Sequence, residues 1–284
     1  MAHKTHIFAA PEPAFLVNSF LLEGADQVVV IDAQFLASSA RALRAKLDAI
    51  GKPLAALILS HPHPDHYNGA AILVEGLGEV PVLATAATNE GIRATAEAKR
   101  AFWTPRYGAD YPQAFVYPNR IVGSGEKLSF GDIELTVDDL GPGESSDIVL
   151  FHAPRTDELF ASDLLYSGCH PWLAEERADL WQAQLDAVKT RYAGTATVHA
   201  GHGPSGTVRL IDAQKDYIAG FEALVRTMVR ADALGDQDKV AIRRIWTERH
   251  PRYPLEFLID FNADAVVAGL ARTLGTERDG LKRL

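Results

Sequence analysis

Three histidines and an aspartate fall within the six residues His61-Pro62-His63-Pro64-Asp65-His66. Residues 57–60 before this segment are Leu, Ile, Leu and Ser, which predicts a buried strand, and a helical pattern begins after Asn68. The cluster is therefore expected at the carboxyl end of a strand, on a turn stiffened by two prolines. One short segment cannot surround two metal ions, so a fold that uses this motif for two ions must bring further ligands to the same place.

The residue types of this motif suit zinc or another first-row divalent metal, because they combine imidazole with carboxylate. His61 and His63 are two residues apart and can share one side of extended chain. Asp65 and His66 follow the start of the turn and can point elsewhere, which would serve a second ion close to the first. A bound divalent metal lowers the pKa of its water to about 7, so that hydroxide is available at neutral pH.

The motif resembles the signature of the metallo-β-lactamase-fold hydrolases. Further segments resemble the motifs of that family, in the family's order, over roughly residues 14–206: residues 28–32 ending in Asp32, residues 141–149 around Glu144, residues 159–165 around Asp163, and residues 198–204 around His202. The resemblance implies two metal sites with these ligands: His61, His63 and Glu144 on the first ion, Asp65, His66 and His202 on the second, and Asp163 bridging both. Asp32 is a candidate for holding the free ring nitrogen of a ligand histidine.

Glu144 departs from the family, which normally has histidine at this position. A glutamate oxygen can still bind zinc, but a third carboxylate lowers the net charge of the centre and tilts its preference towards manganese or ferrous iron. Three alternatives stay open for Glu144: it ligates the first metal, it leaves that site weak so that one metal dominates, or it acts as a general base on the water.

The resemblance implies a metal-dependent hydrolase in which a metal-bound hydroxide attacks an ester, thioester, lactone or amide carbonyl of a small molecule. Asp65 and Glu144 are the candidate catalytic residues besides their role as ligands, and Tyr67, His170 and Trp172 are candidates for the substrate pocket. The expected cofactors are two divalent ions, with zinc favoured over manganese or iron. The alternatives are an iron-dependent dioxygenase on the same scaffold and a non-catalytic binding protein whose site has decayed at Glu144.

Composition agrees with a soluble enzyme. The formal net charge of −9 argues against nucleic acid as a partner, because phosphate backbones attract basic surfaces. Cys169 is the only cysteine, which excludes an internal disulfide and favours a cytoplasmic location. No segment looks like a signal peptide or a membrane span, so no membrane partner is expected.

Local patterns also place helices and a loop around the motif. Residues 38–50 predict a helix that stops at Gly51, and residues 88–102 predict a second helix. Residues 104–118 contain three prolines, among them Pro105, and are expected to form a loop near the site that acts as a lid.

Strands and helices alternate along the first two thirds of the chain, which by itself predicts only an α/β or α+β fold. With the resemblance, we expect an α+β, four-layer αββα sandwich over residues 1–207. Residues 208–284 have the periodicity of helices, with an apolar stripe that includes Tyr217, Phe221 and Val225. They are expected to form a helical C-terminal extension that packs on the sandwich and either shapes the pocket or contributes to a homodimer.

Overall fold

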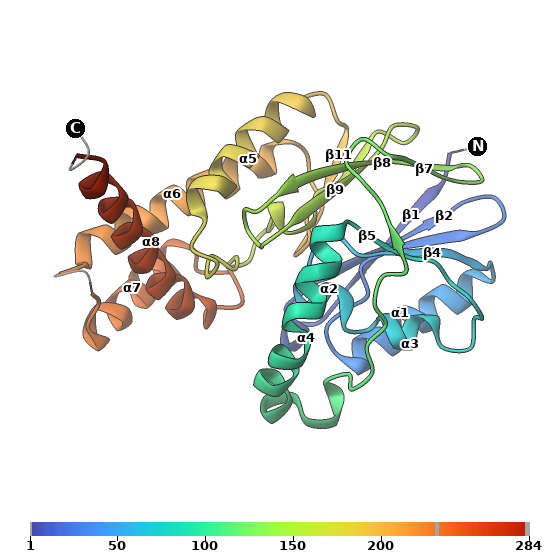
Figure 1. Cartoon of the computed structure of the whole chain (residues 1–284), viewed down its shortest axis with the longest axis horizontal. Coiled ribbons are helices and arrows are strands. Elements are labelled where there is room, and N and C mark those ends of the chain that lie inside the picture. The colour runs from blue at the N-terminus through green and yellow to red at the C-terminus, as the bar shows by residue number, and fades with distance from the viewer. Residues whose placement is uncertain (1, 231–232, 282–284) are drawn as a thin grey trace.

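The computed structural model describes residues 2–230 and 233–281 and contains two β-sheets packed face to face, with helices on both outer sides (Figure 1). This is the four-layer αββα arrangement expected from the sequence. Side chains from the inner faces of both sheets form a shared core, in which Phe20 and Ile31 of one sheet pack with Val149 and Phe160 of the other.

The first sheet has the strand order β1-β2-β3-β4-β5-β6. Its strands are β1 (Lys4–Ala9), β2 (Asn18–Glu23), β3 (Val28–Ile31), β4 (Leu54–Ile58), β5 (Val82–Ala84) and β6 (Arg120–Ile121). The pairs from β3 to β6 are parallel, so their carboxyl ends meet at one edge. Strand β3 is buried on both faces: Val29 and Ile31 face the other sheet, whereas Val28 and Val30 face the outer helices.

The helices on the outer face of the first sheet are α1 (Ala37–Ile50), α3 (Ala70–Val74) and α4 (Ala86–Tyr107), and the single-turn helix α2 (Pro64–Tyr67) lies within the histidine motif. Helix α1 ends where the sequence predicts, at Gly51, whose φ of +73° reverses the chain. Helix α4 is longer than the helix predicted over residues 88–102. Its last turn includes Pro105, so that part of the segment expected to be a loop near the site is helical.

The second sheet has the order β11-β10-β9-β8-β7. Its strands are β7 (Lys127–Phe130), β8 (Ile133–Gly141), β9 (Ile148–Ala153), β10 (Glu158–Phe160) and β11 (Thr197–His199). Helix α5 (Ala178–Arg191) covers the outer face, where the fully buried Trp181 packs with Leu150 and Leu159. A 3-10 helix, η3 (Ser162–Leu164), follows β10 directly.

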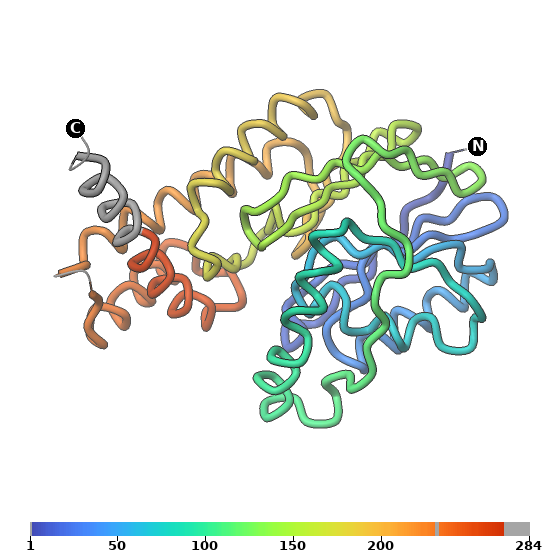
Figure 2. The backbone as a smooth tube through the Cα atoms, viewed as in Figure 1, coloured from blue at the N-terminus to red at the C-terminus, as the bar shows by residue number. Residues whose placement is uncertain are grey.

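The C-terminal helices are α6 (Arg209–Met228), α7 (Asp236–Arg249) and α8 (Leu258–Leu281). The predicted apolar stripe of α6 is a core face: Tyr217, Phe221 and Val225 are buried in one cluster with Trp181 and Trp246. In Figure 2 these helices extend from the second sheet to the end of the molecule far from the N-terminus. Among the described residues, no helix combines the length and the apolar character that a bilayer-spanning segment needs.

Candidate metal centre

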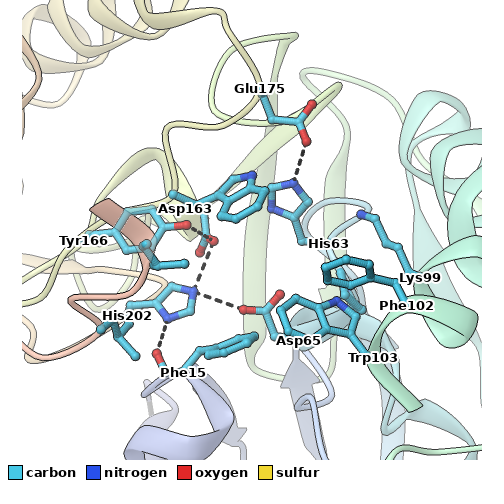
Figure 3. Close-up of a pocket in the computed structure, with 14 residues that line it drawn as sticks. Phe15, His63, Asp65, Lys99, Phe102, Trp103, Asp163, Tyr166, Glu175 and His202 are labelled. Atoms are coloured by element: carbon cyan, nitrogen blue, oxygen red, sulfur yellow. Dashed lines mark hydrogen bonds and ion pairs between the residues drawn. The ribbon is translucent and has the colours of Figure 1, made fainter. Parts of the chain in front are cut away.

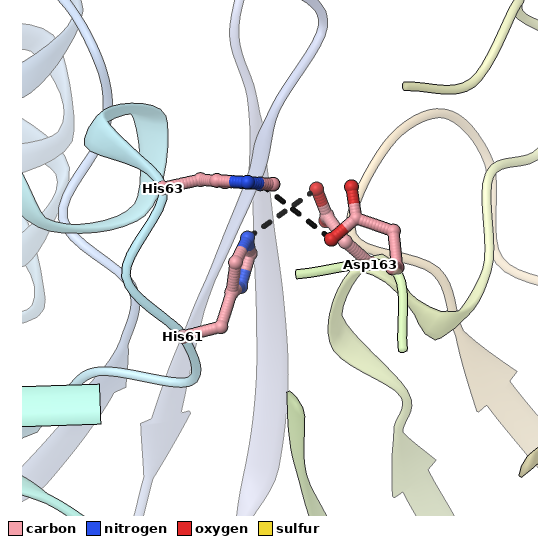
Figure 4. Close-up of side chains that lie close together, drawn as sticks. His61, His63 and Asp163 are labelled. Carbon is pink, nitrogen blue, oxygen red and sulfur yellow. Dashed lines mark ion pairs between the residues drawn. The ribbon is translucent and has the colours of Figure 1, made fainter. Parts of the chain in front are cut away.

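The seven side chains expected as ligands converge at one edge of the sandwich, because each follows the end of a strand at that edge. His61 and His63 follow β4, whose neighbours in the first sheet are parallel to it, and Asp65 and His66 lie on the turn of α2. Glu144, Asp163 and His202 follow β8, β10 and β11 of the second sheet. Figure 4 shows the consequence: His61 and His63 reach in from one sheet and face Asp163, which comes from the other.

The ligands form two groups that share Asp163. The first group contains His61, His63, Glu144 and Asp163, and the second contains Asp65, His66, Asp163 and His202. In each group one ligand atom from every residue lies within 4.8 Å of all the others, and all of these residues are buried. Within the groups, His61 Nε2 is 3.5 Å from Asp163 Oδ2, and His66 Nε2 is 3.2 Å from Asp163 Oδ1.

Several atoms that face the centre of these groups make no hydrogen bond to one another, whereas a metal ion could bind them. Among the described side chains, the buried atoms without a hydrogen-bond partner include His61 Nε2, His66 Nε2, Glu144 Oε2 and Asp163 Oδ1. Leaving such atoms unpaired in the interior costs free energy, and one cation in each of the two groups would satisfy them. The nitrogen and oxygen donors suit zinc and its first-row neighbours.

The outward ring nitrogen of every ligand histidine has a partner, which fixes the ring so that its other nitrogen faces the centre. These contacts are His61 Nδ1 with Ser162 Oγ at 3.0 Å, His63 Nε2 with Glu175 Oε1 at 3.4 Å, His66 Nδ1 with Asp32 Oδ2 at 2.7 Å, and His202 Nδ1 with the Phe15 carbonyl oxygen at 2.7 Å. Asp32 is itself held by the backbone N–H and the hydroxyl of Ser60, so the expected contact of Asp32 with a ligand histidine is present.

Comparison with known proteins agrees with this geometry. The family model described as the metallo-beta-lactamase superfamily matches residues 13–202, a span that includes every proposed ligand. The chain belongs to the metallo-beta-lactamase superfamily. Members of this superfamily are typically metal-dependent hydrolases. No curated protein matches the chain.

Solved structures share the fold of this superfamily member at low sequence identity. A metallo-beta-lactamase family protein from Thermus thermophilus has a TM-score of 0.68 at 22% identity, over 96% of this chain and 94% of that one. A beta-lactamase domain protein from Burkholderia ambifaria has a TM-score of 0.69 at 19% identity, over 97% and 88%. A metallo-beta-lactamase from Pontibacter korlensis has a TM-score of 0.60 at 18% identity and covers only 76% of this chain, against 94% of its own. At these identities the likeness shows the fold alone.

In this metallo-beta-lactamase superfamily member, Tyr166 belongs to the metal centre, and the sequence analysis did not predict it as a site residue. Its hydroxyl lies 2.9 Å from Glu144 Oε1 and 2.7 Å from Asp163 Oδ2, and its ring stacks on that of His202 with 4.6 Å between centroids. It follows Asp163 by three residues, so the short η3 turn brings both side chains to the same side. That spacing was the available signal, but a buried tyrosine in such a turn is more often a packing residue.

The charges of the metal-free centre are strongly shifted by burial and by one another. Burial and the neighbouring Asp163 raise the pKa of Glu144 well above its usual value, which favours the protonated form of this carboxyl group. Burial lowers the pKa of His66, but the carboxylates of Asp163, Asp32 and Asp65 outweigh it and raise that pKa well above the usual value. The pKa of His202 is raised in the same way, chiefly by Asp163. Without metal, bound protons on these side chains therefore offset part of the negative charge of the carboxylates.

Metal binding is therefore expected to release protons. Glu144, His66 and His202 hold protons below their raised pKa values and must give them up to become ligands, so the metal affinity falls as the pH falls. We expect the dissociation constant to rise about tenfold per pH unit for each proton released near neutral pH. Calorimetric titration of the metal-free protein with Zn²⁺, in buffers of different ionisation enthalpy, measures both quantities. An affinity that does not change with pH would contradict this charge assignment.

A cavity of about 200 Å³ opens directly on the ligands. Its walls contain the ligands His63, Asp65, Asp163 and His202, together with Phe15, Pro64, Lys99, Phe102, Trp103, Tyr166, Trp172, Glu175, Leu255 and Leu258 (Figure 3). Helix α4 contributes part of the wall through Phe102 and Trp103, and the C-terminal extension contributes Leu255 and Leu258. The loop after α4, which we expected to be a lid, contributes none of these residues.

The three residues expected in the substrate pocket have different positions. Trp172 lines the cavity. His170 does not: its Nδ1 lies 2.7 Å from the Tyr217 hydroxyl, and it packs among His250 and Tyr253 of the C-terminal extension. Tyr67 is also outside the cavity wall, because it is buried against the outer face of the first sheet and packs near Phe115. The sequence placed all three near the site, but side-chain direction decides which of them reaches the cavity.

Proposed function

We propose that this protein is a hydrolase that uses two divalent metal ions to cleave an ester, thioester, lactone or amide bond of a small molecule. The observation that carries the proposal is the pair of buried ligand groups that share Asp163 and open on a largely apolar cavity. Structural ion-pair networks rarely leave inward atoms such as His61 Nε2 and Glu144 Oε2 without a hydrogen-bond partner while the outward ring nitrogen of every ligand histidine has one. A cavity with apolar walls and a few convergent polar groups is typical of a small-molecule site.

Each part of the site has a defined task in this reaction. When bound, the metals would acidify a water molecule and polarise the carbonyl under attack. Asp32 and Ser60 hold His66 in the orientation that a ligand needs. Tyr166 lines the cavity, and its hydroxyl donates to Asp163 Oδ2, which holds the Asp163 carboxylate in the orientation that a ligand needs. Phe102, Trp103 and Trp172 exclude water and bind the apolar part of the substrate.

One observation favours a second candidate, an iron-dependent dioxygenase. His61, His63 and Glu144 alone make a set of two histidines and one carboxylate, which is the ligand set of many non-haem ferrous oxygenases. Asp65, His66 and His202 argue against it, because a dioxygenase that used only the first site would have no need of a second buried set.

Metal content and a substrate panel together test these proposals. Protein purified without chelator should contain about two ions per chain, in keeping with the two ligand groups. Metal-free protein is then loaded with Zn²⁺, Mn²⁺ or, without oxygen, Fe²⁺, and assayed on esters, thioesters, lactones and amides while oxygen uptake is recorded. Hydrolysis without oxygen uptake supports the hydrolase. Oxygen uptake with iron supports the dioxygenase, and silence with every metal and substrate would favour a protein that only binds its ligand.

The role of Glu144 is tested by two substitutions of different chemistry. Glu144→Gln removes the negative charge but keeps the shape, so the first metal should be lost and the stoichiometry should fall from about two ions to about one. Glu144→His supplies a nitrogen ligand and should keep about two ions while shifting the preference towards zinc. Elemental analysis after dialysis measures both. If Glu144→Gln still holds two ions as tightly as the unchanged protein, Glu144 is not a ligand.

A further inference from the structure

Lys99 is a cation in the wall of the cavity that the proposed metal chemistry does not use. It lies on α4 and shares the wall with His63, Trp103, Trp172 and Glu175 (Figure 3). Lys99 is partly buried there, and this burial lowers the pKa of its ammonium group. A lysine in the wall of a cavity presents a charged donor to any ligand that enters it.

The ammonium of Lys99 is only partly satisfied. Its Nζ donates to the carbonyl oxygen of Pro62 at 3.1 Å, which leaves two of its three N–H groups for other acceptors. Asp65, Glu144 and Glu175 act on it through space, but none of the described carboxylates is within ion-pair distance. Glu175 is already held by His63 and by Arg177, at 3.4 and 3.0 Å.

The position of Lys99 also relates it to the reacting centre. Pro62, the acceptor of its hydrogen bond, joins the ligands His61 and His63, so the ammonium lies beside the first metal site. Three of the seven ligands are carboxylates and offset most of the charge of two divalent cations. Among the described residues of the cavity wall, Lys99 is therefore the free cationic donor that a substrate can reach.

We propose that Lys99 binds an anionic group of the substrate, so that this site prefers acyl compounds that carry a carboxylate or similar anion a few bonds from the bond to be cleaved. This inference rests on the proposed hydrolase function and adds the charge of the substrate to it. The anion would lie between Lys99 and the loop of His63, while Phe102, Trp103 and Trp172 contact the apolar remainder. A charge-assisted hydrogen bond of this kind contributes about 1.5–3 kcal/mol, which corresponds to about a ten- to hundredfold preference.

Matched chromogenic esters test the proposal. 4-Nitrophenyl hydrogen glutarate and 4-nitrophenyl pentanoate have acyl chains of equal length and the same leaving group, and only the first is anionic. The metal-loaded protein should have the higher kcat/KM for the anionic ester, through a lower KM. Lys99→Met keeps the aliphatic stem but removes the charge, and it should lower the ratio of the two kcat/KM values by about ten- to a hundredfold. Lys99→Arg should keep most of the preference.

Two controls separate substrate binding from a structural role. Arg93→Met removes a cation from the same helix at a position over Tyr117, outside the cavity wall, and should leave the ratio unchanged. Elemental analysis shows whether Lys99→Met still binds the same metals. If Lys99→Met lowers kcat/KM equally for both esters, or if it loses metal, Lys99 positions the loop through Pro62 and the proposal is wrong.

A binding experiment keeps the proposal testable even if neither ester is cleaved. Trp103 and Trp172 line the cavity, so their fluorescence reports ligands that enter it. Benzenesulfonate should bind the metal-loaded protein about ten times more tightly, or better, than the neutral methyl phenyl sulfone, and Lys99→Met should abolish the difference. Equal binding of the two probes by the unchanged protein overturns the anion site. Selective binding without cleavage of any ester would instead overturn the hydrolase function alone.

Discussion

Asp163→Asn is expected to empty both metal sites and to lower hydrolysis by about a thousandfold or more. The Asp163 carboxylate faces His61 and His66 with separate oxygens, and it belongs to both ligand groups. An asparagine keeps the shape but has no charge and only one oxygen, so it cannot bridge two ions and would bind either ion only weakly. A bound metal contributes several kcal/mol to such reactions, and each 1.36 kcal/mol is about tenfold in rate.

The measurement is metal content by elemental analysis, followed by kcat/KM on the best substrate of the panel. Asp48→Asn is a matched control, because the Asp48 side chain is exposed and pairs with Arg44 on the surface of α1. Burial raises the pKa of Asp163, but His202 and two other ligand histidines outweigh it and lower that pKa well below its usual value. Metal-free Asp163→Asn should therefore unfold more easily, so both variants are assayed well below their unfolding temperatures. Two tightly bound ions in Asp163→Asn would contradict the bridging role.

Gly201→Ala is expected to disturb the centre without changing any ligand. A Cβ at position 201 would lie 1.9 Å from Asp163 Oδ1 and 2.8 Å from the Ser162 carbonyl carbon, so the Asp163 carboxylate has to move. The backbone cannot give way easily, because the Gly201 N–H donates to Ser162 and the Gly201 carbonyl accepts from Asn18. We expect a loss of about a hundredfold in metal affinity, as for changes in residues that support ligands. Overpacking should also lower the free energy of unfolding by about 1–3 kcal/mol.

The matched control for this substitution is Gly194→Ala. No atom lies within 4 Å of the Cβ that it would add, and its φ is not in the left-handed region. Metal titration and thermal unfolding of the two variants, each with and without metal, separate the effect on the site from the effect on the fold. If Gly201→Ala binds metal as tightly as Gly194→Ala, the close approach of the backbone to Asp163 does not limit the site.

The secondary structure that positions the site follows largely from local patterns. The run Val28-Val29-Val30-Ile31 predicts a strand, and Gly51 predicts the end of α1. The structure confirms both, because strand formation and helix termination depend on residues close in sequence. The predicted C-terminal end of α4 was wrong. Pro105 indicated a loop, but in the structure it lies in the last turn of the helix.

The sequence by itself determined two things about this protein. Its histidine and aspartate motif determined the types of metal-donor atoms, and its motifs together determined the superfamily to which the chain belongs. Only the tertiary structure decided which side chains meet. It brought Tyr166 onto Glu144 and Asp163, turned His170 towards Tyr217 and placed Lys99 in the cavity wall. The physical reason is that donor types are properties of single residues, whereas the direction of a side chain depends on the packing of strands and helices distant in sequence.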